Sequence, residues 1–155
     1  MDDDKNPSEE TEAYWLHAAA PIDEDATYGP SGKWLVYVYE KDLDHAWATI
    51  REATRNGTLG PSSKSGTARE NPNDTAKGAK PTKVICVYTR DADDLDDLGR
   101  VLAELRRLGF NGQLSYKTDE DTREGNYGSG ASLVTSAPGS LEFHTPKSRK
   151  RRQSS

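Results

Sequence analysis

The alternation of apolar and polar positions predicts two strand–helix–strand units along the chain. Short apolar runs rich in β-branched and aromatic residues, at 33–39 and 83–89, are typical of β-strands. Each run precedes a segment in which apolar residues recur every three or four positions, which predicts amphipathic helices over 43–55 and 94–108. The other strands that these patterns predict cover 62–67, 112–117 and 131–136.

Repeated strand–helix–strand units predict a two-layer α/β or α+β domain. Each predicted helix carries one apolar face, so both helices are expected to cover the same side of the sheet. In the first strand, side chains alternate between the two faces, which groups Trp34 with the valines and Lys33 with Tyr37. The apolar group suits the helix layer. The open side of the sheet is therefore expected to present Lys33 and Tyr37.

Composition divides the chain into one folded domain and several polar segments. Only 32% of the residues are hydrophobic, 30% are charged, and the mean hydropathy is -0.94, which is too polar for a chain folded from end to end. We expect a single domain over 14–136, between a disordered acidic N-terminus at 1–13 and a disordered tail at 137–155. A segment of Gly, Pro, Asn and Lys at 66–82 is expected to be a mobile loop.

Charge is distributed unevenly, and this bears on possible partners. The chain has 26 acidic residues against 21 lysines and arginines, and five of the basic residues lie at 147–152, beyond the last acidic one. An acidic body repels phosphate backbones at long range, so general nucleic-acid binding is not favoured. The basic tail leaves nucleic-acid contact open, but a solvated terminus is the simpler interpretation.

The sequence also excludes several classes of protein and site. No apolar run approaches the roughly 18–20 residues of a membrane span, and the first residues do not resemble a signal peptide. A cytoplasmic protein without membrane contact is therefore expected. The single cysteine, Cys86, excludes a disulfide scaffold and a cysteine-built zinc site, and no metal or cofactor is predicted. The oligomeric state is left open.

Basic residues within the predicted elements are the candidates for a functional site, because no established catalytic motif is present. Several cations that converge on one sheet face of an acidic body would mark an anion site, most simply a phosphate site. The alternative is that they are ordinary surface lysines paired with the abundant acids. The basic residues in question are Lys33, Lys64, Lys117 and Arg123.

Four motifs in matching order resemble the basophilic leukaemia-expressed protein family. They are SGKWL at 31–35, LDHAW at 43–47, VICVYT at 84–89, and Tyr116 and Lys117 with Thr122, Gly125 and Tyr127. The resemblance covers about 31–127. It implies an α+β fold like that of the cap-binding translation initiation factor, with a curved, mainly antiparallel sheet and two main helices on one face. Trp34 and Trp47 are nevertheless predicted to be core residues rather than planes for a methylated base.

A second resemblance, to phosphothreonine lyases, implies roles for the basic residues. Those enzymes remove phosphate by β-elimination, with a strand lysine that takes the α-proton and a histidine two residues on as the acid. The resemblance implies that Lys33 is the base. Position 35 is leucine, so Tyr37, on the same strand face, is the candidate acid. The residues implied to bind the phosphate are Lys64, Lys117 and Arg123.

Two functions follow as expectations. The first is a phosphothreonine lyase-like protein that acts on, or binds, a phosphorylated amino acid or peptide through a basic pocket on the open sheet face. The alternative is a non-enzymatic module that binds a nucleotide, an RNA cap or an RNA end on the same face. Elimination needs an acid group beside the leaving phosphate, whereas binding does not. The absence of the histidine at position 35 therefore bears on elimination and not on binding.

Overall fold

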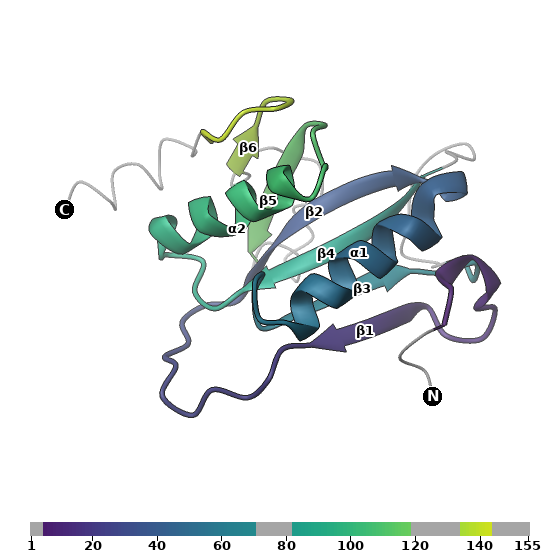
Figure 1. The fold of residues 1–155 in the computed structure, drawn as a ribbon, viewed down its shortest axis with the longest axis horizontal. Coiled ribbons are helices and arrows are strands. Elements are labelled where there is room, and N and C mark those ends of the chain that lie inside the picture. Colours follow the sequence, from purple (N-terminus) through teal and green to yellow (C-terminus); the bar gives the residue numbers. More distant parts are fainter. Residues whose placement is uncertain (1–4, 71–81, 119–133, 144–155) are drawn as a thin grey trace.

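The computed structural model describes residues 5–70, 82–118 and 134–143, and within these ranges the chain forms an antiparallel six-stranded sheet and two α-helices (Figure 1). The order of strands across the sheet is β1-β3-β4-β2-β5-β6. The strands are β1 (Trp15–Ala19), β2 (Gly32–Tyr39), β3 (Ser62–Gly66), β4 (Thr82–Thr89), β5 (Leu114–Thr118) and β6 (Val134–Ser136). The helices are α1 (Leu43–Arg55) and α2 (Leu95–Arg107). Neither helix is long and apolar enough to cross a membrane.

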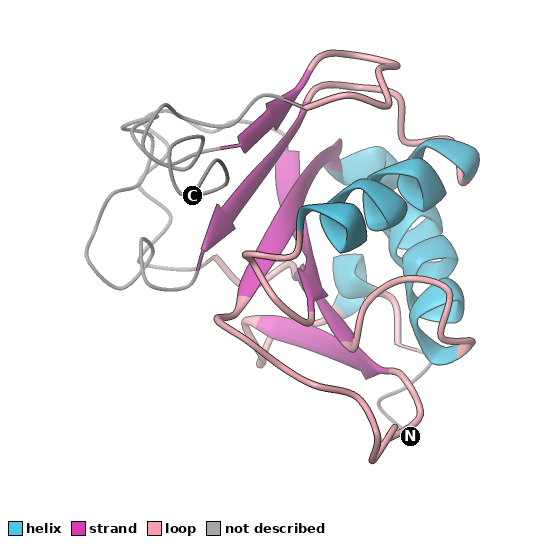
Figure 2. Cartoon of the chain, turned by 90° about the vertical axis from the view of Figure 1, so that its left-hand side faces the viewer, coloured by secondary structure: helices cyan, strands magenta, loops and turns pink. Residues whose placement is uncertain are grey.

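Both helices lie on the same face of the sheet, and Figure 2 shows the two layers edge-on. The strand pairs are all antiparallel, which confirms the α+β alternative and excludes a parallel sheet with helices on both faces. Alternation along β2 also agrees with the prediction: Trp34 and Val36 are buried toward the helices, whereas Tyr37 is 62% exposed on the other side.

The core between the two layers is centred on tryptophan. Trp34 on β2 is 0% exposed and Trp47 on α1 is 1% exposed, which confirms that both are core residues. The indole of Trp34 donates a hydrogen bond to the backbone oxygen of Leu98, 3.2 Å away, and its ring meets Tyr116 edge-on at 5.4 Å between centroids. These contacts fix β2 and β5 beneath α2. Neither tryptophan is placed to stack on a bound base.

α2 begins at a capping aspartate, and a glycine follows the end of each helix. The backbone N–H of Asp97 donates to the side chain of Asp94, the N-cap of α2, and the acidic first turn and basic last turn match the helix dipole. Gly57 and Gly109 follow the two helices with φ of 79° and 103°, in the left-handed region where glycine is favoured.

β1 is a strand that the apolar pattern does not predict. It forms one edge of the sheet, where Leu16 pairs with Ser65 and Ala18 with Ser63 on β3. Leu16 and Ala18 point toward the helices and are buried, so the strand extends the core beneath α1.

Part of the segment that was predicted to be disordered, residues 5–13, is described by the structure and packs beside α1. It contains a 3-10 helix (Pro7–Glu9), and the backbone N–H of Ser8 donates to Asp44 at 2.9 Å. The carboxylate of Glu10 accepts the backbone N–H groups of Glu12 and Ala13 at 2.9 and 2.8 Å. Local hydrogen bonds thus hold this polar segment without an apolar core of its own. Most of the predicted loop, residues 71–81, lies outside the described ranges.

The hydrogen bonds of Glu10 predict a pH-dependent contribution to stability. The backbone donors of Ala13 and Glu12, and then Lys5, hold the pKa of this carboxyl below its ordinary value of 4.5. A depressed pKa means that the contribution is present above the unfolded-state pKa and is lost as the pH falls through the folded-state value. We expect Glu10→Gln to lower the melting temperature at neutral pH, and the difference from wild type to shrink as the pH falls through the lowered pKa of Glu10.

Thermal unfolding across pH, with Glu9→Gln as the matched control, measures this effect. Glu9 is exposed and neighbours the same turn, so its variant should follow the wild type at every pH. A Glu10→Gln difference that is the same in acid as at neutral pH would show that the ionised carboxylate contributes nothing.

Candidate functional site

The register of the sheet arranges the side chains of the open face in rows across the strands. Lys33 on β2 lies directly opposite Tyr88 on β4 and Lys117 on β5. Opposed residues in an antiparallel sheet point to the same face, with Cβ atoms about 4.5–5.5 Å apart. We call these three residues the lysine row. Two of the predicted basic residues are therefore direct neighbours on the face that the helices leave open.

Lys64 belongs to the neighbouring row of side chains on this face, and its amine extends toward Tyr88 in the lysine row. On β3 it pairs with Cys86, and its Nζ lies 4.1 Å from the ring centroid of Trp15 and 5.9 Å from that of Tyr88. The Nζ of Lys33 lies 5.6 Å from the same Tyr88 ring. Such cation–π contacts are worth about 0.5–1 kcal/mol at exposed sites and hold the amines in place. The aromatic ring of Tyr88 thus lies between two of the predicted lysines.

The burial of the two paired lysines is unusual for this residue type. Lys33 is 8% exposed and Lys117 is 3% exposed, and both have interaction partners, as buried lysines generally do. Their side chains project from opposed positions on two neighbouring strands. Amines on one sheet face are the donors that a phosphate group accepts from most strongly.

Tyr37 lies farther along the same face. It is four residues beyond Lys33 on β2, about 13 Å along the strand, with Leu35 between them. The structure therefore does not place the predicted acid beside the predicted base, and the catalytic role of Tyr37 stays a prediction. The ring of Tyr88, directly opposite Lys33, lies closer to the amine, at 5.6 Å from Nζ to its centroid.

The remaining predicted site residue, Arg123, lies outside the described ranges. Among the residues that are described, no group of three His, Cys, Asp or Glu could hold a metal ion. Trp15 and Tyr88, which contact the lysines, were missed at the level of sequence. Alternation along 83–89 puts Tyr88 on the face of Cys86, but only the pairing of that strand with β2 brings it to Lys33.

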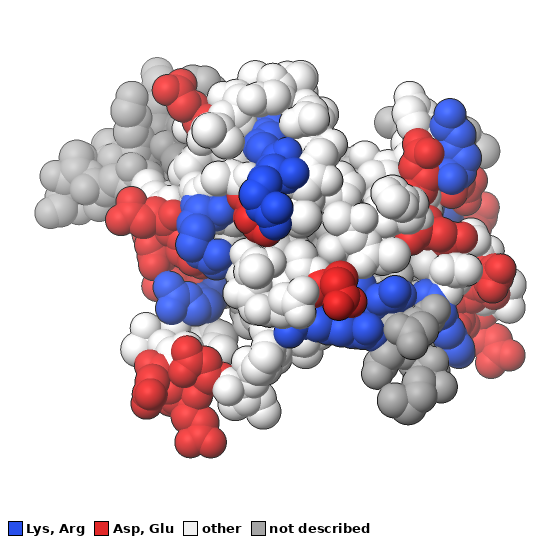
Figure 3. Space-filling view, in the orientation of Figure 1, with Lys and Arg blue, Asp and Glu red and all other residues white. Residues whose placement is uncertain are grey.

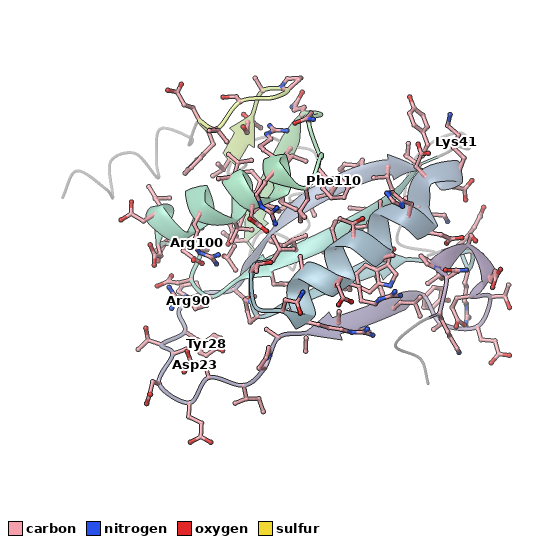
Figure 4. All side chains as sticks on the ribbon, in the orientation of Figure 1. Asp23, Tyr28, Lys41, Arg90, Arg100 and Phe110 are labelled. Atoms are coloured by element: carbon pink, nitrogen blue, oxygen red, sulfur yellow. The ribbon has the colours of Figure 1, made fainter. Side chains whose placement is uncertain are left out.

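The other basic side chains near the sheet belong to a different environment. Figure 3 views the helix-covered face, where lysine and arginine side chains lie among aspartate and glutamate. Figure 4 labels Arg90 and Arg100 near the start of α2. Arg100 Nε lies 3.0 Å from a carboxylate oxygen of Asp97, and Arg100 also donates to the backbone oxygens of Thr58 and Leu59. These arginines already have carboxylate and carbonyl partners, so they are poorer candidates for an anion site.

A comparison with known families supports the first resemblance. Residues 25–122 match the family model described as Basophilic leukemia-expressed protein Bles03. The match spans more than half of the chain and includes β2, α1, β3, β4, α2 and β5. All three lysines of the candidate site lie within it. The likenesses to the cap-binding translation initiation factor and to phosphothreonine lyases stay predictions.

Proposed function

The chain belongs to the basophilic leukemia-expressed protein family, and we propose that it binds a phosphorylated peptide on the open face of its sheet, as a phosphothreonine lyase-like protein. The observation that supports this most strongly is the convergence of Lys33 and Lys64 on the ring of Tyr88, with Lys117 directly opposite Lys33. Three amines from three strands provide several charge-assisted hydrogen bonds to one phosphate.

The reaction proposed for this site is β-elimination. As the proposed base, the amine of Lys33 takes the α-proton of the phosphothreonine, and the electron pair of that C–H bond forms the Cα–Cβ double bond. The Cβ–O bond breaks, and phosphate leaves with its electron pair and takes a proton from an acid. Lys64 and Lys117 stabilise the departing negative charge. Tyr37 is the acid proposed from the sequence, and the position of Tyr88 makes its phenol a second candidate.

Phosphothreonine and phosphoserine peptides test this proposal directly. We expect both to bind at least about tenfold more tightly than their unphosphorylated forms in a calorimetric titration. Elimination would appear in mass spectrometry as loss of phosphoric acid from the peptide, whereas hydrolysis would leave the hydroxyl behind. Binding without mass loss would restrict the protein to a binding role. No preference for the phosphorylated peptides would refute the proposal.

A second candidate function is binding of a nucleotide or an RNA end on the same face. The observation that favours it is the exposure of aromatic side chains there, since Tyr37 and Tyr39 are 62% and 56% exposed. Nucleic-acid bases stack on such rings while lysines hold the phosphates. A 5′-phosphorylated oligonucleotide that binds more tightly than every phosphopeptide would favour this candidate.

A further inference from the structure

Ser8 connects the segment before β1 to the first turn of α1. It donates twice to the carboxylate of Asp44: its hydroxyl oxygen lies 2.5 Å from Oδ2, and its backbone nitrogen lies 2.9 Å from Oδ1. The preceding residue, Pro7, is buried, and its backbone oxygen accepts the N–H of Ala68 at 2.9 Å. Ser8 itself is exposed. A hydroxyl at the surface therefore helps to hold residues 5–13 against the domain.

The side chains that follow Ser8 are acidic. Two glutamates come directly after it, and a third stands four residues on. Residues 5–13 contain one cation, Lys5, and its amine lies 3.2 Å from a carboxylate oxygen of Glu10. An exposed serine followed by several acids is complementary in charge to the basic substrate groove of an acidophilic protein kinase.

We infer that Ser8 is a phosphorylation site and that its phosphorylation releases residues 5–13 from α1. The kinase transfers the terminal phosphoryl group of ATP to Ser8 Oγ. The new O–P bond forms, the bond between that phosphorus and the leaving ADP breaks, and the hydroxyl proton is released. The hydrogen that Asp44 accepts is then lost, and a phosphate of about −1.5 to −2 charges stands beside its carboxylate. Like charges at this distance repel, so the segment separates from the helix.

Treatment of the full chain with ATP and an acidophilic serine/threonine kinase tests this inference. We expect mass spectrometry to find phosphate on Ser8 in the wild type and no modification of this position in Ser8→Ala. Hydrogen exchange then measures release. The backbone N–H groups of Ser8 and Ala68 should exchange at least about tenfold faster after phosphorylation, whereas those within β2 and β4 should keep their rates.

Asp44→Lys tests whether repulsion is the cause. In this variant the phosphate on Ser8 faces an ammonium group, so phosphorylation should slow the exchange of the same two N–H groups instead of accelerating it. Thr11→Glu is the matched control for added charge. Thr11 is exposed and stands three residues after Ser8, and this variant should leave the exchange of the Ser8 N–H unchanged.

Three results would overturn the inference. The first is failure of the kinase to modify Ser8, and the second is a phosphorylated protein in which Ser8 and Ala68 exchange at the unmodified rate. The third is faster exchange after phosphorylation of Asp44→Lys, because the release would then not come from repulsion by the carboxylate of Asp44. None of these results depends on whether the open face binds a phosphopeptide.

Discussion

Replacing Arg106 with methionine is expected to destabilise the fold by about 3 kcal/mol or more. Arg106, in the last turn of α2, is 8% exposed, and its guanidinium is a hydrogen-bond donor to five oxygen atoms. Four are backbone oxygens, and the fifth is a serine hydroxyl. The acceptors are Phe110 O at 2.8 Å, Gly112 O at 2.6 Å, Ala137 O at 2.8 Å, Ser140 O at 2.9 Å and Ser136 Oγ at 3.2 Å.

The size of this effect follows from what the substitution leaves behind. Burial lowers the pKa of Arg106, but an arginine keeps its charge throughout the range in which the protein folds. The methionine side chain fills a similar volume without donating a hydrogen bond, so several buried oxygens would lose their partners. The substitution also removes the hydrogen bonds that link Ala137 and Ser140 to α2, in a segment that was expected to be a disordered tail.

Urea unfolding of Arg106→Met beside Arg107→Met measures the effect. Arg107 is the next residue, its side chain is 67% exposed, and it pairs with Glu104, so its loss should cost no more than about 0.5 kcal/mol. Arg106→Lys should recover only a part, because one amine cannot reach all five oxygens. Equal unfolding midpoints for the variants at 106 and 107 would contradict this account.

Lys33→Ala is expected to abolish elimination while it weakens phosphopeptide binding by only about 1–3 kcal/mol, the worth of one charge-assisted hydrogen bond. The base is needed for the α-proton, whereas Lys64 and Lys117 still hold the phosphate. Lys117→Ala should instead weaken binding and turnover together, because it contacts only the phosphate in this proposal.

Binding and turnover are to be measured on the same phosphothreonine peptide for each variant. Lys41→Ala is the control. Lys41 is exposed and follows the end of β2, whereas Lys33 stands at the start of that strand (Figure 4). If Lys33→Ala turns the peptide over at the wild-type rate, Lys33 is not the base. If the wild type itself does not turn the peptide over, only the binding part of the proposal can hold.

Helix positions were predictable because the signal for a helix is local. Apolar residues at spacings of three and four, followed by Asn56 and Gly57 or by Gly109, predicted 43–55 and 94–108, against observed bounds of Leu43–Arg55 and Leu95–Arg107. The same holds for β2 and β4, whose β-branched and aromatic residues distinguish them from their surroundings.

β1 was not predictable because its signal is not local. WLHAA at 15–19 has no β-branched residue, so it does not stand out as a strand, whereas its partner β3 lies within the strand predicted at 62–67. Their pairing depends on backbone hydrogen bonds and on the burial of Leu16 and Ala18 against a core that other segments build.

The candidate site was predictable in part, for a similar reason. Alternation put Lys33 on the open side of its strand, and the structure shows it there with Lys117 directly opposite. Their position opposite each other depends on the register between distant strands, which no short pattern specifies. The contacts of the lysines with Tyr88 and Trp15 depend on the same register.

The position of β2 in the sheet has a consequence for the newly synthesised chain. β2 lies between β4 and β5, and both emerge from the ribosome only after residues 40–81 have emerged. Until then, a strand carrying Trp34 and Val36 has neither of its sheet neighbours, and an unpaired apolar strand can pair with the same strand of another chain. The interval between translation of β2 and translation of β4 is therefore when this protein is most prone to aggregate, and when protection by a chaperone would matter most.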